Sequence, residues 1–299
     1  MIALRDITDG WNAFFFAREP ASTIALFRLL FGGLLLTNAL LFARDARLWV
    51  GPRGVLSHEQ YCTLYGHSRF TLLRYLPATD ASATAVLGVH LIAAVCLTIG
   101  FMTRPSAAVA FLTLISLQHR NPFVCYGADD VMRVLCFLLI FSRAGEAFSV
   151  DQWRAARSGQ VLPEGTAWCT RLMQLQVSTI YLQAFLSKFS GTSWLAGTAV
   201  YYAVEAPRYR RYRLPRFARN LFWSRIATWG TIAVEFALGP LIWIRELRLP
   251  VLVAGIALHL GMEVFMNLHL FSTTMIVSLM LFLDPHAVER MFHGGWWPW

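Results

Sequence analysis

One lysine stands apart in this chain of 299 residues. The sequence holds 26 lysines and arginines together, and Lys188 is the only lysine among them. It follows an otherwise apolar segment, residues 168–186. Arginine is effectively always protonated, whereas a lysine in a low-dielectric site can lose its proton and act as a base or an amine nucleophile. Lys188 therefore predicts chemistry that needs a neutral amine.

Two simpler explanations of Lys188 stay open. A lysine at a helix end can extend its amine to the membrane interface while its stem lies in lipid. A genome rich in G and C would also replace lysine by arginine without any selection for chemistry. Position and uniqueness alone do not separate these explanations from a catalytic role.

Polar side chains lead along the same segment toward the lysine. Arg171, Gln174, Ser178, Tyr181 and Lys188 follow one another at steps of 3, 4, 3 and 7 residues. In a helix these steps place all five on one face. We expect that face to turn away from lipid.

A second polar face is predicted near the end of the chain. His259, Glu263 and Asn267 are spaced by four residues, which again places them on one side of a helix. A histidine and a carboxylate one turn apart suit either a proton relay or half of a metal site. No third ligand lies within reach in the sequence, so we expect no metal.

A polar segment, residues 119–130, separates two apolar stretches. Pro122 disfavours helix just before it, Gly127 permits a tight turn, and Asp129 can then cap the next helix. Capping accounts for one aspartate but leaves three consecutive polar residues unexplained. We expect the segment to present donors to an anionic or quinone-like ligand through His119, Arg120 and Asn121, with Asp130 helping to line the pocket.

Other ionisable residues also fall in apolar segments. A charge at the bilayer centre costs at least about 2.5 kcal/mol, so each one marks a candidate site. The alternative for Arg28, Asp130, Arg133 and Glu235 is a set of internal ion pairs that fix the order of the helices. A coupled transporter that also uses Glu263 is the least favoured reading, because no internal repeat is visible.

The composition identifies an integral membrane protein. Hydrophobic residues make up 57% of the chain and charged residues 14%, against about 25% charged residues in a soluble domain. The net charge of +9 suits loop arginines that face anionic lipid. No nucleic-acid module is visible, so no nucleic acid is expected as a partner. The five cysteines form neither a CxxC pair nor a metal-binding spacing.

These residues need helices to position them. A spanning helix takes about 20 apolar residues. We predict an all-α, polytopic transmembrane bundle of about eight spans, one domain over residues 1–299, in the inner or plasma membrane. An amphipathic segment over residues 1–20 is expected to lie at the interface. The predicted spans are 21–42, 81–102, 106–118, 131–142, 168–186, 226–243, 250–266 and 270–283.

The charges of the loops give a conflicting topology. With the N-terminus inside, eight spans place most basic loops in the cytoplasm. The same count places the arginines of residues 208–225 outside. Either residues 194–205 enter the membrane as a re-entrant hairpin or short span, or this loop is an exception to the rule.

Several segments, in this order, resemble the HTTM domain, the membrane domain shared by vitamin K-dependent gamma-carboxylase and many bacterial proteins. The most specific is residues 181–194, YLQAFLSKFSGTSW, in which a span ends in lysine and a short turn leads to Trp194. The resemblance covers nearly the whole chain. Its other elements are residues 51–57 (GPRGVLS), 119–130, 171–174 (RLMQ), 197–199 (GTA) and 267–272 (NLHLFS).

The resemblance implies a specific chemistry. In the carboxylase the lysine at the end of that span deprotonates vitamin K hydroquinone, which then reacts with oxygen to give a strongly basic alkoxide and finally the epoxide. Carried over, that base is Lys188, with reduced vitamin K or menaquinol as cofactor, O2 and CO2 as co-substrates, and a peptide or protein as substrate. The residues expected to bind substrate are His119, Arg120, Asn121, Asp130, Tyr181, Trp194, His259, Glu263 and Asn267.

A non-catalytic reading also remains. The eukaryotic carboxylase has a large region after its last span that grips propeptides, and here residues 284–299 follow the last predicted span. The arginines of residues 208–225, interleaved with Tyr209, Tyr212 and Phe217, suit lipid headgroups or an acidic peptide. The alternative is therefore a membrane factor for lipid binding or for the maturation or export of a peptide.

Overall fold

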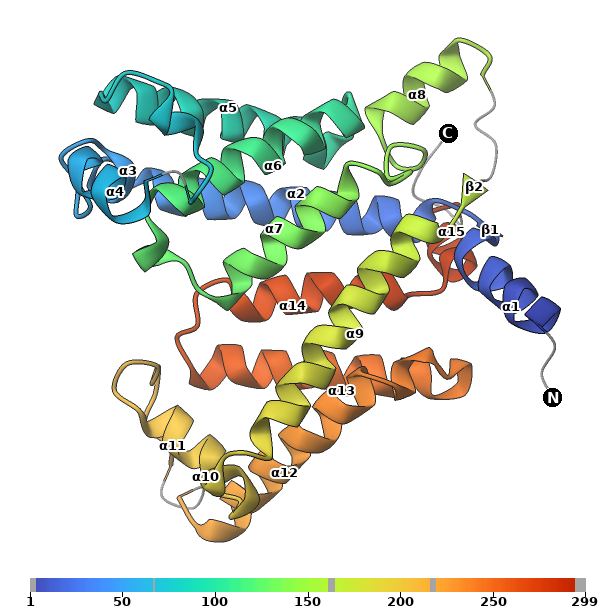
Figure 1. Cartoon of the computed structure of the whole chain (residues 1–299). Helices are drawn as coiled ribbons and strands as arrows, with labels where there is room; N and C mark the ends of the chain where they lie inside the picture. The colour runs from blue at the N-terminus through green and yellow to red at the C-terminus, as the bar shows by residue number, and fades with distance from the viewer. Residues whose placement is uncertain (1–3, 67, 161–164, 216–218, 294–299) are drawn as a thin grey trace. The chain divides into compact units, whose positions relative to one another are not determined.

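The computed structural model describes residues 4–66, 68–160, 165–215 and 219–293 (Figure 1). The described residues form fifteen α-helices, as the all-α prediction requires. One short exception is a two-stranded antiparallel sheet of β1 (Arg18–Glu19) and β2 (Gly165–Thr166). The chain divides into two compact units, one of Met1–Arg171 with Leu283–Trp299 and one of Leu172–Phe282. The single domain expected over residues 1–299 stays a prediction.

The first unit, which we call the N-terminal unit, is built around α2 (Ser22–Ala43), α5 (Asp80–Ile99) and α6 (Thr103–Arg120). Gly32 lets α2 and α5 approach closely because it has no side chain. A Cβ at Gly32 would lie only 2.6 Å from the Thr98 hydroxyl oxygen. Its other helices are α1 (Leu4–Phe16), α3 (Ala46–Val50), α4 (His58–Tyr65), η1 (Leu72–Arg74), η2 (Pro122–Val124), α7 (Gly127–Leu139), α8 (Val150–Arg157) and α15 (Pro285–His293).

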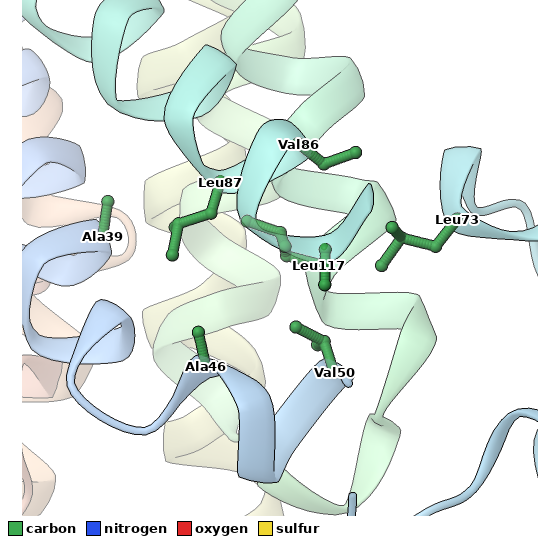
Figure 2. Packing of buried hydrophobic residues seen from close by; sticks show 8 residues of the cluster. Ala39, Ala46, Val50, Leu73, Val86, Leu87 and Leu117 are labelled. Carbon is green, nitrogen blue, oxygen red and sulfur yellow. The ribbon is translucent and has the colours of Figure 1, made fainter. Parts of the chain in front are cut away.

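A hydrophobic cluster joins five of these helices. Figure 2 shows small and branched apolar side chains from α2, α3, η1, α5 and α6 directed toward one another. Their contact holds the short helices after α2 against the long ones, and removes the apolar side chains from the surface. The cluster consists of Ala39, Ala46, Val50, Leu73, Ala83, Val86, Leu87 and Leu117.

The second unit, which we call the C-terminal unit, takes most of α9 (Trp168–Lys188) and the helices up to Phe282. A Cβ at Gly255 would lie 2.9 to 3.0 Å from the side chains of Leu238 and Leu279, so this glycine lets α12, α13 and α14 pack together. The helices are α10 (Thr192–Leu195), α11 (Ala199–Glu205), α12 (Leu221–Leu238), η4 (Leu241–Trp243), α13 (Arg245–Phe265), α14 (Phe271–Leu279) and η5 (Met280–Phe282).

Every predicted span coincides with a helix, yet eight spans are not confirmed. Among the described residues, three helices are long and apolar enough to cross a membrane alone: Ser22–Ala43, Asp80–Ile99 and Arg245–Phe265. Phe271–Phe282 with Pro285–Phe292 would add a fourth if the two are one bent span. The other helices are shorter or carry polar residues on the face that packs inward, as α9 does.

The two segments predicted to lie at the interface or to enter the membrane both contain helices. Helix α1 exposes Ile7, Trp11 and Phe16, which are 49 to 59% exposed, so the N-terminal segment is a helix with a large apolar surface. Residues 1–3 of that segment lie outside the described residues. Residues 194–205, predicted to enter the membrane, form the end of α10 and α11, and their entry stays a prediction.

Candidate functional site

Lys188, the last residue of α9, faces a carboxylate from α12. Its Nζ donates a hydrogen bond to Glu235 Oε1 at 2.8 Å and lies 2.6 Å from Oε2. A further bond joins Nζ to the carbonyl oxygen of Ala184 at 3.2 Å. Nζ thus donates two hydrogen bonds, and each side chain of the pair is only 12% exposed. The Lys188–Glu235 pair is therefore a largely buried ion pair.

One aromatic ring contacts this pair. Nζ lies 4.7 Å from the centre of the Trp194 ring, within the range of a cation–π interaction. On the same two helices Phe185 packs against Phe189 and Phe236, with ring centres 4.9 and 5.1 Å apart. The Trp194 ring adds its attraction for the Lys188 cation to that of the carboxylate. Lys188 and Trp194, both predicted site residues, thus meet at one place.

The pair can hold or release one proton. As an ion pair Lys188 is an acid, and a base needs the neutral amine. Transfer of one proton from Nζ to Glu235 would give a neutral amine and a carboxylic acid, and burial disfavours two charges more than two neutral groups. The internal ion pair expected for Glu235 is confirmed, with Lys188 as its partner. The signal for Glu235 was its place as the one carboxylate within α12.

The polar face predicted along α9 is confirmed. Gln174, Ser178 and Tyr181 are 3 to 7% exposed. Gln174 donates to the carbonyl of Leu281 at 2.7 Å, and the Ser178 hydroxyl accepts from the Trp243 indole at 3.0 Å. These partners hold α9 against η4 and η5 inside the C-terminal unit. The first member of the face, Arg171, instead pairs with Glu19 in the N-terminal unit.

Tyr181 meets a second predicted residue, His259 of α13. The phenol oxygen lies 2.8 Å from His259 Nε2, and both side chains are buried. His259 Nδ1 is buried and has no hydrogen-bond partner among the described residues. A buried tyrosine and histidine in contact can pass a proton.

The predicted line of His259, Glu263 and Asn267 does not act as one face. His259 bonds Tyr181, whereas Glu263 pairs with Arg211 at 2.8 Å. Helix α13 ends at Phe265, so Asn267 lies beyond it and its backbone N–H donates to the carbonyl of Tyr209 at 2.6 Å. The sequence spacing missed this because a loop from elsewhere in the chain captures the end of α13.

The polar segment of residues 119–130 lies in the N-terminal unit, where its side chains hold backbone. Arg120 Nη2 donates to the carbonyls of Gly51 and Leu56 at 3.2 and 3.0 Å, and its guanidinium lies 5.2 Å from the Tyr61 ring centre. Asn121 donates to the carbonyl of Trp49 at 2.9 Å. Arg120 Nη2 and the Asn121 amide thus fasten α3 and the loop that follows it, while Arg120 Nη1 is buried and has no hydrogen-bond partner among the described residues.

His119 belongs to a small charged network. Its Nδ1 lies 3.0 Å from the carbonyl oxygen of Phe70 and its Nε2 lies 2.9 Å from Arg133 Nη1. A histidine that donates from Nδ1 accepts at Nε2, so this geometry fits the neutral ring. Arg133 also pairs with Asp130, which confirms an internal ion pair for these two residues.

Two further sequence expectations can be compared with their contacts. Asp129 takes part in the cap of α7, as its side chain accepts from the Tyr126 N–H at 2.9 Å, but Tyr126 is the N-cap residue because the helix begins earlier than predicted, at Gly127. Arg28, expected in an internal ion pair, instead donates to the carbonyls of Leu97, Thr98 and Phe148 at 2.6 to 3.1 Å. Backbone carbonyls at a helix end carry partial negative charge, and here they replace a carboxylate.

The candidate residues thus fall into two sets. His119, Arg120, Asn121 and Asp130 belong to the N-terminal unit, and the six others to the C-terminal unit. Among the described residues, no three His, Cys, Asp or Glu side chains are grouped as metal ligands would be.

Comparison with known proteins gives one family and one relative. The family model described as the HTTM domain matches residues 16–286. Sporulation-delaying protein SdpB of Bacillus subtilis strain 168 is 24% identical over 217 residues. That alignment covers 63% of this chain and 65% of SdpB, so the match spans just under two thirds of the relative's length. No solved structure matches the chain.

Proposed function

Because the chain belongs to the HTTM family, we propose that it is a multi-pass enzyme of the cell membrane that takes up a reduced quinone and exchanges a proton with it through the Lys188–Glu235 pair. The observation that carries the proposal is the pair itself. It combines the chain's only lysine with a carboxylate 2.6 Å away, beside the Trp194 ring.

The proposed reaction is the oxidation of a quinol by O2. Lys188, as the neutral amine, takes one proton from a quinol hydroxyl, and the quinolate reacts with O2. One oxygen atom enters the ring as the epoxide and the other leaves as water with the two protons of the quinol. General-base catalysis of this kind contributes about 10²- to 10⁴-fold.

Glu235 has a defined part in this scheme. It accepts the proton that Lys188 must lose before it can act, and it returns that proton when the cycle closes. The energy released by epoxidation would drive carboxylation by CO2, or a related modification, on a peptide or protein. Tyr181, two turns before Lys188 on the polar face of α9, is hydrogen-bonded to His259 of α13, and these two residues would help to line the site.

The test is oxygen-dependent epoxidation of reduced vitamin K or menaquinol by the purified protein in lipid nanodiscs. We expect epoxide from the wild type, at least 100-fold less from Lys188→Ala, and about tenfold less from Glu235→Gln. Ser187→Ala, one residue before the lysine and exposed, is the matched control and should keep full activity. Unchanged epoxidation by a folded Lys188→Ala protein would exclude the proposed base.

A second candidate function has its own observation. The arginine-rich loop after α11 lies beside an apolar groove of the C-terminal unit, an arrangement that suits a lipid or an acidic peptide better than quinol chemistry. On this reading the protein is a non-catalytic membrane factor for lipid binding or for maturation or export of a peptide. Absence of epoxide from a folded, quinol-supplied protein would favour it.

A further inference from the structure

An apolar cavity of the C-terminal unit has a lining that does not include Lys188. It is a groove of about 290 Å³ formed by α11, the first half of α12, one loop residue and the last residue of α13. The hydroxyl of Ser224, one of the lining residues, donates to the carbonyl of Gly197 at 2.8 Å. The lining residues are Val200, Tyr201, Val204, Leu214, Trp223, Ser224, Ile226, Ala227 and Phe265.

One wall of this groove is held in place by Glu205, the last residue of α11. Its carboxylate accepts from the backbone N–H of Leu214 at 3.3 Å and lies 3.4 Å from Arg210 and 3.6 Å from Arg219. The carboxylate thereby fixes the arginine loop over α11. This hydrogen bond consequently holds Leu214 in the wall of the groove.

The opposite wall is held by a second set of contacts. Arg211 pairs with Glu263, and its N–H donates to the carbonyl of Phe265 at 3.1 Å. The pairing of Arg210 with Met266 continues this connection. The loop after α11 and the end of α13 are thus joined by side-chain and backbone contacts. These contacts hold the two walls of the groove in place within the C-terminal unit.

The charge beside the groove exceeds what these carboxylates neutralise. Residues 206–225 hold seven arginines and no acidic residue. Among the described residues, Arg213 makes no ion pair, and Arg208 contacts only the Tyr209 ring, 5.6 Å away. Both are exposed, and Arg213 directly precedes Leu214 of the groove. A positive edge therefore borders an apolar hollow.

The groove also lies where a lipid would meet it. Helix α13 is one of the three helices long and apolar enough to span a membrane, and Phe265 is its last residue. The end of a spanning helix lies near the headgroups. Trp223 and Ile226 are 46 and 48% exposed, so the groove is open on the α12 side.

We propose that this groove binds one hydrocarbon chain of an anionic phospholipid, whose phosphate lies against Arg213 and Arg208. The volume lies at the lower limit of the about 300 to 1,000 Å³ typical of small-molecule sites, so it suits one chain and not a whole lipid. Arginine binds phosphate through two parallel hydrogen bonds, and the cationic group of a zwitterionic lipid would be repelled by the two arginines, which gives the preference for an anionic headgroup. The site does not depend on quinol chemistry at Lys188.

The experiment is a titration of detergent-purified, delipidated full-length protein with dioleoyl phosphatidylglycerol and, separately, dioleoyl phosphatidylcholine. Native mass spectrometry counts the lipids that remain bound. The two lipids share their chains and differ in headgroup charge. For the first lipid bound, we expect phosphatidylglycerol to bind at least tenfold more tightly.

Variants separate the charge from the chain. Arg213→Glu, at an exposed position, should lower the preference for phosphatidylglycerol about tenfold. Arg245→Glu is the matched control, since it makes the same change of charge at the first residue of α13, about 30 Å along the helix from Phe265. Ala227→Phe, which adds bulk to the groove, should weaken both lipids alike.

Three outcomes would overturn the proposal. Equal loss of preference in Arg213→Glu and Arg245→Glu would mean a general effect of charge. Unchanged binding in a folded Ala227→Phe protein would mean that the chain lies elsewhere. Displacement of the first phosphatidylglycerol by menaquinone would assign the groove to the quinone tail. None of these results depends on epoxidation, so this proposal and the proposed function can fail separately.

Discussion

Two regions of the molecule bury basic side chains at helix ends, and they use them differently. At the end of α6, Arg120 and Asn121 donate to backbone carbonyls of Gly51, Leu56 and Trp49. At the end of α9, Lys188 donates to a carboxylate. A carbonyl can only accept a hydrogen bond, whereas a carboxylate can also take a proton. Burial of a charged residue therefore indicates a chemical site only when its partner can titrate.

The largest expected effect is on the chemistry of the second region. Lys188→Arg keeps a cation opposite Glu235 but removes the possibility of a neutral base, because arginine remains protonated. We expect epoxidation to fall at least 100-fold in a protein that remains folded, because the ion pair with Glu235 can still form. Quinol turnover measures the rate, and chemical denaturation of the same preparation checks that the protein is folded. Retained turnover would show that the reaction does not need a neutral amine at position 188. The contrast between a chemical role for Lys188 and a structural role for Arg120 would then fail.

The reciprocal change belongs to the first region. Arg120→Lys keeps the charge but cannot reproduce the geometry of a guanidinium that reaches two carbonyls and the Tyr61 ring. We expect the free energy of unfolding to fall by about 1 to 3 kcal/mol, the cost of leaving buried acceptors without a donor. Turnover per folded molecule should not change. A selective loss of turnover, with stability intact, would instead indicate a ligand at Arg120.

A smaller effect is expected at the hydrogen bond between Tyr181 and His259 in the C-terminal unit. Tyr181→Phe removes the hydroxyl that bonds His259 and leaves the ring in place. We expect a loss of about 1 kcal/mol in the free energy of unfolding, since one buried hydrogen bond is lost. Ser187→Ala is the control for a hydroxyl lost at the surface. A rate loss much larger than the stability loss would make Tyr181 part of the proton path.

The smallest effect is a pH dependence in the N-terminal unit. Burial, aided by the charge of Arg133, lowers the pKa of His119 below its usual value, although its bond to the Phe70 carbonyl opposes the shift. The unfolded chain then binds a proton more readily than the folded one. The stability that neutral His119 contributes is present above about pH 6.5 and is lost as the pH falls below that value.

The measurement is the difference in Tm between pH 7.5 and pH 5.5. Wild type should lose more stability at pH 5.5 than His119→Gln does. His286→Gln controls for the removal of any histidine. Equal losses of Tm in wild type and His119→Gln would show that protonation of His119 does not cause the loss of stability at pH 5.5.

Much of the fold followed from periodicity and composition. Apolar stretches gave helices in every predicted position, because the spacing of apolar residues reports which face is buried. The steps between Gln174, Ser178 and Tyr181 predicted their burial for the same reason. Asp129 took part in the cap of α7 because capping depends on residues within one turn. The number of spans did not follow, since helices packed against protein need not be apolar on every side.

The sequence by itself determined the local features of this protein: its helices, the buried face of α9, the caps, and a single lysine at a helix end. Tertiary structure alone decided the partners. Glu235 stands 47 residues beyond Lys188, and the carbonyls that hold Arg120 come from residues more than 60 positions before it. Hydrogen bonds and ion pairs act over about 3 Å. Residue type therefore shows what a side chain can do, and only the approach of distant helices shows what it does.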